Sequence, residues 1–166
     1  MTPWIIGAGR TGKAIGSWAT TVISCSLLLT LGTFICKGEA AMTIESLIKT
    51  YETALNTNDI DAILGLYGTE PVFMPQHAPA LIGRDAVRAG YKQVFETIKL
   101  NIRFEIHEIQ EAGDWAWART SSAGRTRILA ANIELQEGNN ELFIFRKEAG
   151  KWKIHRYLFS TNQPRA

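Results

Sequence analysis

Residues 100–107 read Leu-Asn-Ile-Arg-Phe-Glu-Ile-His, and in this stretch every second residue is apolar. Strict alternation is typical of a strand with one buried and one solvent-facing side. Before this stretch, apolar residues recur instead at intervals of three and four, which is the helical period. The chain therefore changes from helices to strands near Leu100. This order predicts an α+β fold with its helices packed on one face of a sheet.

Three helices are predicted before the change, over 44–55, 60–67 and 84–98. Thr43 and Asp59 stand where they can cap the first two helices, because their side-chain oxygens can accept from free backbone N–H groups. Between the second and third helices, 71–75 carries a proline at each end and is predicted to be a short extended segment.

Turn signals divide the rest of the chain. After the strand that begins at Leu100, further strands are predicted over 115–122, 127–136, 141–147 and 152–160. The turns between them are expected at Gly113-Asp114, Ala123-Gly124, 138–140 and 148–150, because Gly, Asn and Asp favour tight turns. Strands joined by hairpins predict an antiparallel sheet.

Composition and charge limit the classes of function. The chain has 166 residues, of which 46% are hydrophobic and 10% aromatic, as in a globular protein with one domain and an appendage. Residues 42–166 contain 15 basic and 15 acidic side chains, so the net charge of +2 comes from the first 41 residues. This balance excludes the one-sided basic surface of a nucleic-acid binder.

The first 41 residues are predicted to be a leader, and 42–166 the domain. Arg10 and Lys13 precede the uncharged run 18–36, and small residues follow at 38–40, as in a signal peptide or a membrane anchor. The protein would then be exported or anchored, with membrane contact only through the leader. Alternatively, translation starts at Met42 and the protein is cytoplasmic.

The leader also contains the G-x-G-x-x-G pattern of a nucleotide site at 7–12, but an apolar run follows it rather than a helix and a parallel sheet. Both cysteines, Cys25 and Cys36, lie in the leader too. The domain can therefore use no disulfide, no thiolate metal site and no cysteine nucleophile.

Several motifs resemble one family. The string 51–61, Tyr-Glu-Thr-Ala-Leu-Asn-Thr-Asn-Asp-Ile-Asp, resembles the opening of ketosteroid-isomerase-like and SnoaL-like proteins of the nuclear-transport-factor-2-like superfamily. Residues 83–88, 113–120 and 150–154 are similar to further signatures of it, closest to the SgcJ/EcaC-type branch. The resemblance covers nearly all of residues 43–164.

The resemblance implies a cone-shaped, cystatin-like fold, in which three N-terminal helices pack on a curved antiparallel sheet around a pocket. It also implies a homodimer formed through the sheet. The family's helix-1 tyrosine corresponds to Tyr51, whereas its two catalytic acids fall near Met74 and Leu142. Both positions are apolar here, so steroid-isomerase proton transfer is disfavoured.

The site predicted on this basis has two groups of residues. The candidate catalytic residues are Tyr51, His77, Glu108 and Arg119. The candidate ligand-binding residues are Tyr51, Met74, Gln76, Tyr91, Phe95, Phe104, Trp117 and Phe145.

The charged candidates have alternatives. Arg119 and Glu141, if both point inward, form a buried pair that either holds a ligand or fixes the sheet. Glu108 continues the inward side of the first strand unless a bulge near Ile109 turns it outward. His77 is expected in a loop at the pocket mouth. There it either acts as an acid or base near neutral pH or is an exposed loop residue without a role in the site.

His107 and His155 are expected to face solvent or an interface, and three dispersed histidines predict no metal site. We therefore expect a pocket for a small, largely apolar molecule, with a capacity for cofactor-independent acid/base chemistry of the isomerase, lyase or cyclase type. No cofactor is expected. The alternative is a non-enzymatic dimerisation or ligand-carrier module.

Overall fold

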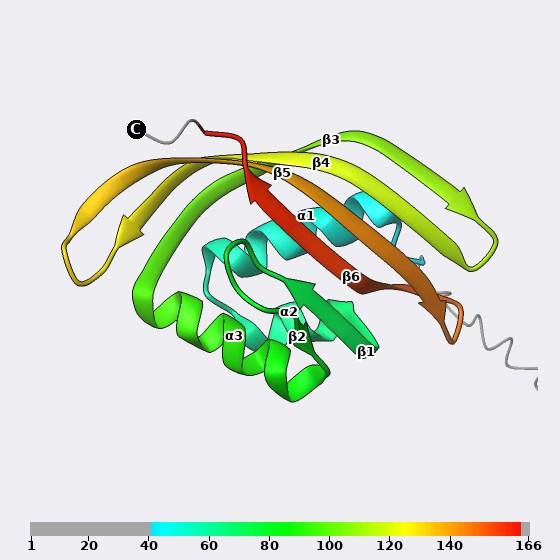
Figure 1. The fold of residues 1–166 in the computed structure, drawn as a ribbon. Helices are drawn as coiled ribbons and strands as arrows, with labels where there is room; N and C mark the ends of the chain where they lie inside the picture. The colour runs from blue at the N-terminus through cyan, green and yellow to red at the C-terminus, as the bar shows by residue number, and fades with distance from the viewer. Residues whose placement is uncertain (1–40, 164–166) are drawn as a thin grey trace, which may run out of the picture. The chain divides into compact units, whose positions relative to one another are not determined.

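The computed structural model describes residues 41–163 (Figure 1). The predicted leader, with its cysteines and its G-x-G-x-x-G pattern, lies outside the described residues. Among the residues that are described, no helix is long and apolar enough to cross a membrane.

Three helices form as predicted: α1 (Ile44–Asn56), α2 (Ile60–Leu66) and α3 (Arg84–Thr97). Both predicted caps are confirmed. The Oγ1 atom of Thr43 accepts from the backbone N–H of Ser46 at 3.2 Å, and Oδ1 of Asp59 accepts from that of Ala62 at 2.9 Å. These short-range bonds satisfy N–H groups that the helices leave free at their first turns.

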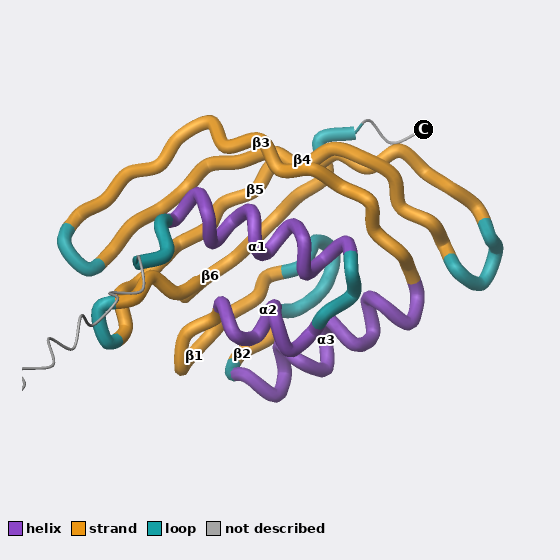
Figure 2. The backbone as a smooth tube through the Cα atoms, turned by 180° about the vertical axis from the view of Figure 1, so that it is seen from behind, coloured by secondary structure: helices purple, strands orange, loops and turns teal. Residues whose placement is uncertain are grey.

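Six strands form one curved sheet in the order β2-β1-β6-β5-β4-β3. Their bounds are β1 Tyr67–Met74, β2 Leu81–Ile82, β3 Ile98–Ala112, β4 Trp115–Ile128, β5 Ile133–Glu148 and β6 Lys151–Thr161. In Figure 1 the long strands arch over the helices, and Figure 2 shows the same arrangement from behind. The predicted α+β cone is confirmed.

The sheet differs from the prediction in one pairing. Strand β1 runs parallel to β6, whereas every other pair is antiparallel. The sheet is therefore mixed, because the chain crosses from β1 through α3 and three long strands before β6 returns beside β1. The segment predicted as 71–75 is also longer, since β1 begins directly after α2.

Two predicted turns are wrong. Strand β4 continues through Ala123-Gly124, and β5 continues through 138–140. A Cβ atom on Gly124 would lie 2.1 Å from the backbone oxygen of Asn101 on β3, and one on Gly138 would lie 2.5 Å from Oδ1 of Asn162. The contact at Gly124 is with backbone, so this glycine serves close approach between strands rather than a turn. The atoms nearest to Gly138 are the ends of side chains that follow β6. The turn itself falls at 129–132, where Asn132 has a positive φ of 53°.

The edge strand β3 is tied to α1. The side chain of Asn56 donates to the carbonyl of Ile102 at 2.8 Å and accepts from its N–H at 2.9 Å. One turn earlier, Glu52 accepts from the N–H of Phe104 at 2.7 Å. The helix thus satisfies backbone groups that an edge strand would otherwise expose.

Candidate functional site

A cavity of about 130 Å³ lies between the helices and the concave face of the sheet. Apolar side chains make up most of its wall, and the polar groups come from two helices and from β5 and β6. The lining residues are Tyr51, Leu55, Phe73, Pro75, Tyr91, Val94, Ile98, Leu100, Ile102, Glu137, Asn139, Glu141, Tyr157 and Phe159.

Glu141 is the most unusual group in this wall, because only 4% of its surface is exposed. The hydroxyl of Tyr157 donates to its Oε2 at 3.1 Å. Burial raises the pKa of Glu141 to about 8, against the lowering effect of hydrogen bonds with Ser122 and Tyr157 and with a further rise from the negative charge of Glu137. At neutral pH the side chain is therefore protonated and can donate a hydrogen bond.

Three more tyrosines form a hydroxyl cluster beside the cavity, and two of them, Tyr51 and Tyr91, line it. The hydroxyls of Tyr51 and Tyr91 lie 2.6 Å apart, and those of Tyr67 and Tyr91 lie 2.9 Å apart. The ring of Tyr51 meets that of Tyr157 edge-on, with centroids 5.4 Å apart. Burial raises the pKa of all four phenols well above the ordinary value, so none of them is ionised at neutral pH.

A second polar group lies along the same strand. Alternation on β5 turns Glu137, Asn139 and Glu141 to the concave face. Oε2 of Glu137 accepts from the hydroxyl of Thr126 at 2.9 Å, and Oε1 accepts from the amide of Asn139 at 3.2 Å. The same amide donates to Oγ of Ser122 at 3.3 Å. Glu137 is half-buried, whereas Glu141 is buried, so Glu137 is the carboxylate nearer to solvent.

Of the predicted aromatic residues, Tyr51 and Tyr91 line the cavity. Three others pack around them without lining it. The ring of Phe104 lies 5.9 Å from that of Tyr51, and the ring of Phe95 lies 6.1 Å from that of Tyr91. Phe145 is fully buried and stacks on Phe143 at 5.8 Å.

Met74 and Gln76, both predicted to bind the ligand, do not line the cavity. Met74 is half-buried on β1 between the lining residues Phe73 and Pro75, and strand alternation turns it to the face opposite Phe73. The side-chain oxygen of Gln76 accepts from the N–H of Thr161, which fastens the loop after β1 to the end of β6.

Arg119, Glu108 and Trp117 lie on the convex face of the sheet, away from the cavity. Nε of Arg119 lies 3.5 Å from Oε2 of Glu108, and both side chains reach solvent. Placing Glu108 inward is wrong because a bulge between Ile106 and Glu108 shifts the register of β3. This is the alternative that the sequence left open.

The buried Arg119–Glu141 pair is also wrong. In the register of β4 and β5, Glu141 lies opposite Thr120, and Arg119 lies opposite Leu142. Glu141 points inward as its alternation with Phe143 predicts, but Arg119 and Trp117 have the other parity. The pattern of Trp115–Ser122 did not show which side was buried, because small residues (Ala116, Ala118, Thr120) occupy the inward positions.

The three histidines lie outside the cavity wall. His77 is exposed in the loop after β1, with a positive φ of 60°. His107 lies 2.8 Å from Oγ of Ser121. His155, expected to face solvent or an interface, is only 9% exposed, and its ring meets that of Trp115 edge-on at 5.1 Å. Burial, followed by the charges of Arg156 and Arg146, lowers its pKa.

The site residues that the sequence analysis missed are Glu137, Asn139 and Tyr157. Reading 138–140 as a turn hid the alternation that brings Glu137 and Asn139 to the same face as Glu141. Tyr157 alternates with Phe159 on β6, and this pattern was the available signal. In residues 41–163 no three His, Cys, Asp or Glu side chains lie close enough together to hold a metal ion.

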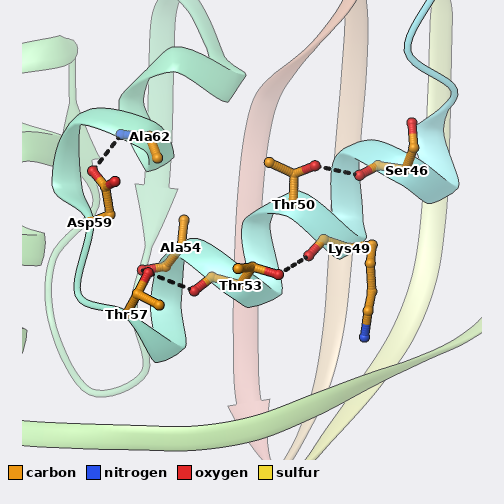
Figure 3. A pocket seen from close by; sticks show the side chains of 8 residues that line it. All are labelled: Ser46, Lys49, Thr50, Thr53, Ala54, Thr57, Asp59 and Ala62. Atoms are coloured by element: carbon orange, nitrogen blue, oxygen red, sulfur yellow. Dashed lines mark hydrogen bonds between the residues drawn. The ribbon is translucent and has the colours of Figure 1, made fainter.

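A groove along the outside of α1 is a weaker candidate (Figure 3). Its hydroxyl groups are engaged by their own helix. Thr50 donates to the carbonyl of Ser46 at 2.8 Å, Thr53 to that of Lys49 at 3.1 Å, and Thr57 to that of Thr53 at 2.8 Å. The groove is a solvated helix face, and the cavity under the sheet is the better site.

The chain resembles several solved structures. A ketosteroid isomerase-like protein from Erwinia carotovora atroseptica is 34% identical, with 76% of this chain and 99% of that chain covered and a TM-score of 0.71. Two more distant structures share the fold alone. A putative aromatic ring hydroxylase from Novosphingobium aromaticivorans has 22% identity, coverages of 73% and 87%, and a TM-score of 0.64. A protein with a cystatin-like fold from Nostoc punctiforme has 16% identity, coverages of 72% and 88%, and a TM-score of 0.59.

No curated protein matches the chain. A family model described as a SnoaL-like domain matches residues 48–155, from within α1 to within β6. The narrower SgcJ/EcaC-type assignment stays a prediction. Fold, cavity and family match agree: the chain belongs to the SnoaL-like family, within the ketosteroid-isomerase-like group of ligand-binding domains.

Proposed function

We propose that the cavity binds a compact, largely apolar molecule and holds one of its oxygen atoms against Glu141 and Tyr157. The observation that carries this proposal is Glu141, a protonated carboxyl group that is almost fully buried in a mostly apolar wall. The bond from Tyr157 offsets part of the cost of burying the carboxyl group, and the acid form also carries a proton that it can donate. A carbonyl or hydroxyl oxygen of a ligand is an acceptor that suits it.

The size of the cavity limits the ligand. An apolar cavity of about 150 Å³ holds a benzene molecule, and the cavity of this protein, at about 130 Å³, is of that order. Drug-sized ligands occupy larger pockets, of roughly 300 Å³ or more. A ligand with a single ring fits this space, whereas a steroid does not.

The arrangement also supports chemistry on such a ligand. A hydrogen bond from the acid form of Glu141 would stabilise negative charge that develops on a carbonyl oxygen, in a site with little water. This is the acid half of cofactor-independent isomerase, lyase or cyclase chemistry. The hydroxyl groups of Tyr51 and Tyr91 lie within hydrogen-bond distance of each other, and the two rings meet edge-on.

Acetophenone and ethylbenzene are suitable probes, because they have a similar shape and only acetophenone has an acceptor oxygen. We expect the protein to bind acetophenone at least about tenfold more tightly than ethylbenzene at pH 6, which corresponds to about 1.4 kcal/mol. The preference should fall as the pH rises through about 8, where Glu141 loses its proton. Calorimetry or ligand-detected NMR would measure both affinities.

The Glu141→Gln variant is the matched control, since its amide donates at every pH. It should keep the preference for acetophenone at pH 6 and retain it at pH 9. Equal binding of the two probes by the unmodified protein at pH 6 would refute the proposal.

The convex face of the sheet supports a second proposal, that the domain associates with a second copy of itself. Trp115 is 45% exposed and Trp117 is 37% exposed, and both line a groove on this face with Leu142 and Ile144. Large exposed aromatic side chains grouped in this way are typical of protein interfaces.

A further inference from the structure

The cavity has a second polar end besides Glu141. Glu137 lies on the same strand and the same face, four residues away, and lines the same space. It is half-buried while Glu141 is buried, which places it toward the solvent side of the cavity. A ligand whose oxygen meets Glu141 would therefore present its other end to Glu137.

Neighbouring side chains hold the carboxylate of Glu137 in place. Thr126, 5% exposed, donates to Oε2, and Asn139, 6% exposed, donates to Oε1. Each carboxylate oxygen has two acceptor positions, so one position on each oxygen remains for a ligand. A group positioned by buried partners keeps its geometry before the ligand arrives.

The charges around the cavity are one-sided. Among the described residues that line it, none is Lys, Arg or His, and the two acidic side chains are Glu137 and Glu141. Because Glu141 is protonated at neutral pH, the negative charge in the wall is that of Glu137. A ligand carboxylate placed beside it would meet a like charge with no cation to offset it, and in a partly desolvated site this repulsion is strong.

From this geometry we infer that Glu137 selects ligands by charge. The cavity accepts a molecule that has an acceptor oxygen at one end and a neutral hydrogen-bond donor or a cation at the other, and it rejects carboxylates. The inference rests on the proposed function, because it assumes that the oxygen end lies against Glu141.

Three probes that differ only in their outer end test the inference: acetophenone, para-(aminomethyl)acetophenone and para-acetylbenzoate. At pH 7 we expect the aminomethyl compound to bind at least as tightly as acetophenone. The benzoate should bind about tenfold or more weakly than acetophenone. In Glu137→Gln, which removes the charge and keeps the shape, the gap between acetophenone and the benzoate should shrink to about threefold or less.

Glu108→Gln is the matched control. It makes the same substitution on the convex face of the same sheet, where Glu108 pairs with Arg119, and it should leave the order of the three probes unchanged. The order in the unmodified protein is a second test that does not depend on how well a variant folds.

The outcomes separate the two proposals. If acetophenone binds better than ethylbenzene but para-acetylbenzoate binds equally well, or if Glu137→Gln keeps the tenfold gap, charge selection by Glu137 is wrong and the cavity's function stands. If acetophenone shows no advantage over ethylbenzene, the function fails and the selection fails with it.

Discussion

At the scale of single residues, Glu141 makes the free energy of unfolding depend on pH. Its pKa is 4.5 in an unfolded chain and about 8 in the folded one, so the folded state binds the proton more tightly. The stability that this proton provides is fully present below pH 4.5 and is lost as the pH rises to about 8. The total loss is roughly 5 kcal/mol, at about 1.4 kcal/mol per pH unit.

Urea unfolding between pH 4 and pH 9 would measure this loss as the difference between the protein and its Glu141→Gln variant. Other carboxyl groups titrate in both proteins, so their contributions cancel in the difference. The groups that face Glu141 are Ser122, Tyr157 and the more distant Glu137, together with the phenols of Tyr51 and Tyr91. A difference that stays constant with pH would mean that folding does not raise the pKa of Glu141.

The direction of a side chain on the sheet was predictable where it depended on the alternation within a single strand. The alternation of Glu141 with Phe143 and Phe145 gave the correct inward direction for Glu141. Arg119 and Glu108 were misplaced because their direction depends on a neighbouring strand: the register of β4 against β5 decides one, and the bulge in β3 decides the other. The pKa of Glu141 depends on residues from several elements around the cavity, so no local sequence pattern predicts it.

At the scale of elements, side chains of α1 form hydrogen bonds with the backbone of the edge strand β3. Asn56→Ala removes both partners of the Ile102 backbone, and a buried backbone group without a partner costs about 1–3 kcal/mol. Since Asn56 is half-buried, water can replace part of the loss, and we expect destabilisation of about 2 kcal/mol. The amide of Ile102 should also exchange its hydrogen faster.

Thr53→Ala is the control on the same helix. The hydroxyl of Thr53 donates to the carbonyl of Lys49 within α1 and does not contribute to the link between α1 and β3. It should change the free energy of unfolding by less than about 0.5 kcal/mol. If Asn56→Ala costs no more than this control, the link between α1 and β3 does not stabilise the domain.

The helices were predicted almost to the residue, because caps and apolar periodicity act within a few residues of the chain. The strands were predicted less well. Gly124 and Gly138 look like turn residues in the sequence, but both lie inside strands, and the backbone that requires a glycine at 124 belongs to Asn101 on β3. The parallel pairing of β1 with β6 likewise joins segments about 80 residues apart, so no local pattern indicates it.

At the scale of the whole molecule, the two proposed functions belong to opposite faces of the sheet. The concave face forms the cavity with the helices, and the convex face carries the apolar groove of Trp115, Trp117 and Ile144. None of the residues that line the cavity also lines this groove. Association through the convex face would therefore leave the contents of the cavity unchanged, and the two functions can be tested independently.

We predict that the protein sediments as a dimer and that Trp117→Glu or Ile144→Glu shifts it to the monomer. A carboxylate placed among the apolar side chains of this groove would have to lose its water when two copies meet, and this desolvation opposes association. Thr53→Glu, on the outer face of α1, is the matched control and should leave the dimer intact. Sedimentation velocity over a range of concentrations would measure the oligomeric state of the unmodified protein and of the three variants.

The monomeric variants should still prefer acetophenone to ethylbenzene by the same factor, since the groups that hold the oxygen lie on the other face. A monomeric unmodified protein, or a dimer that survives both substitutions, would show that the convex face is not where two copies meet.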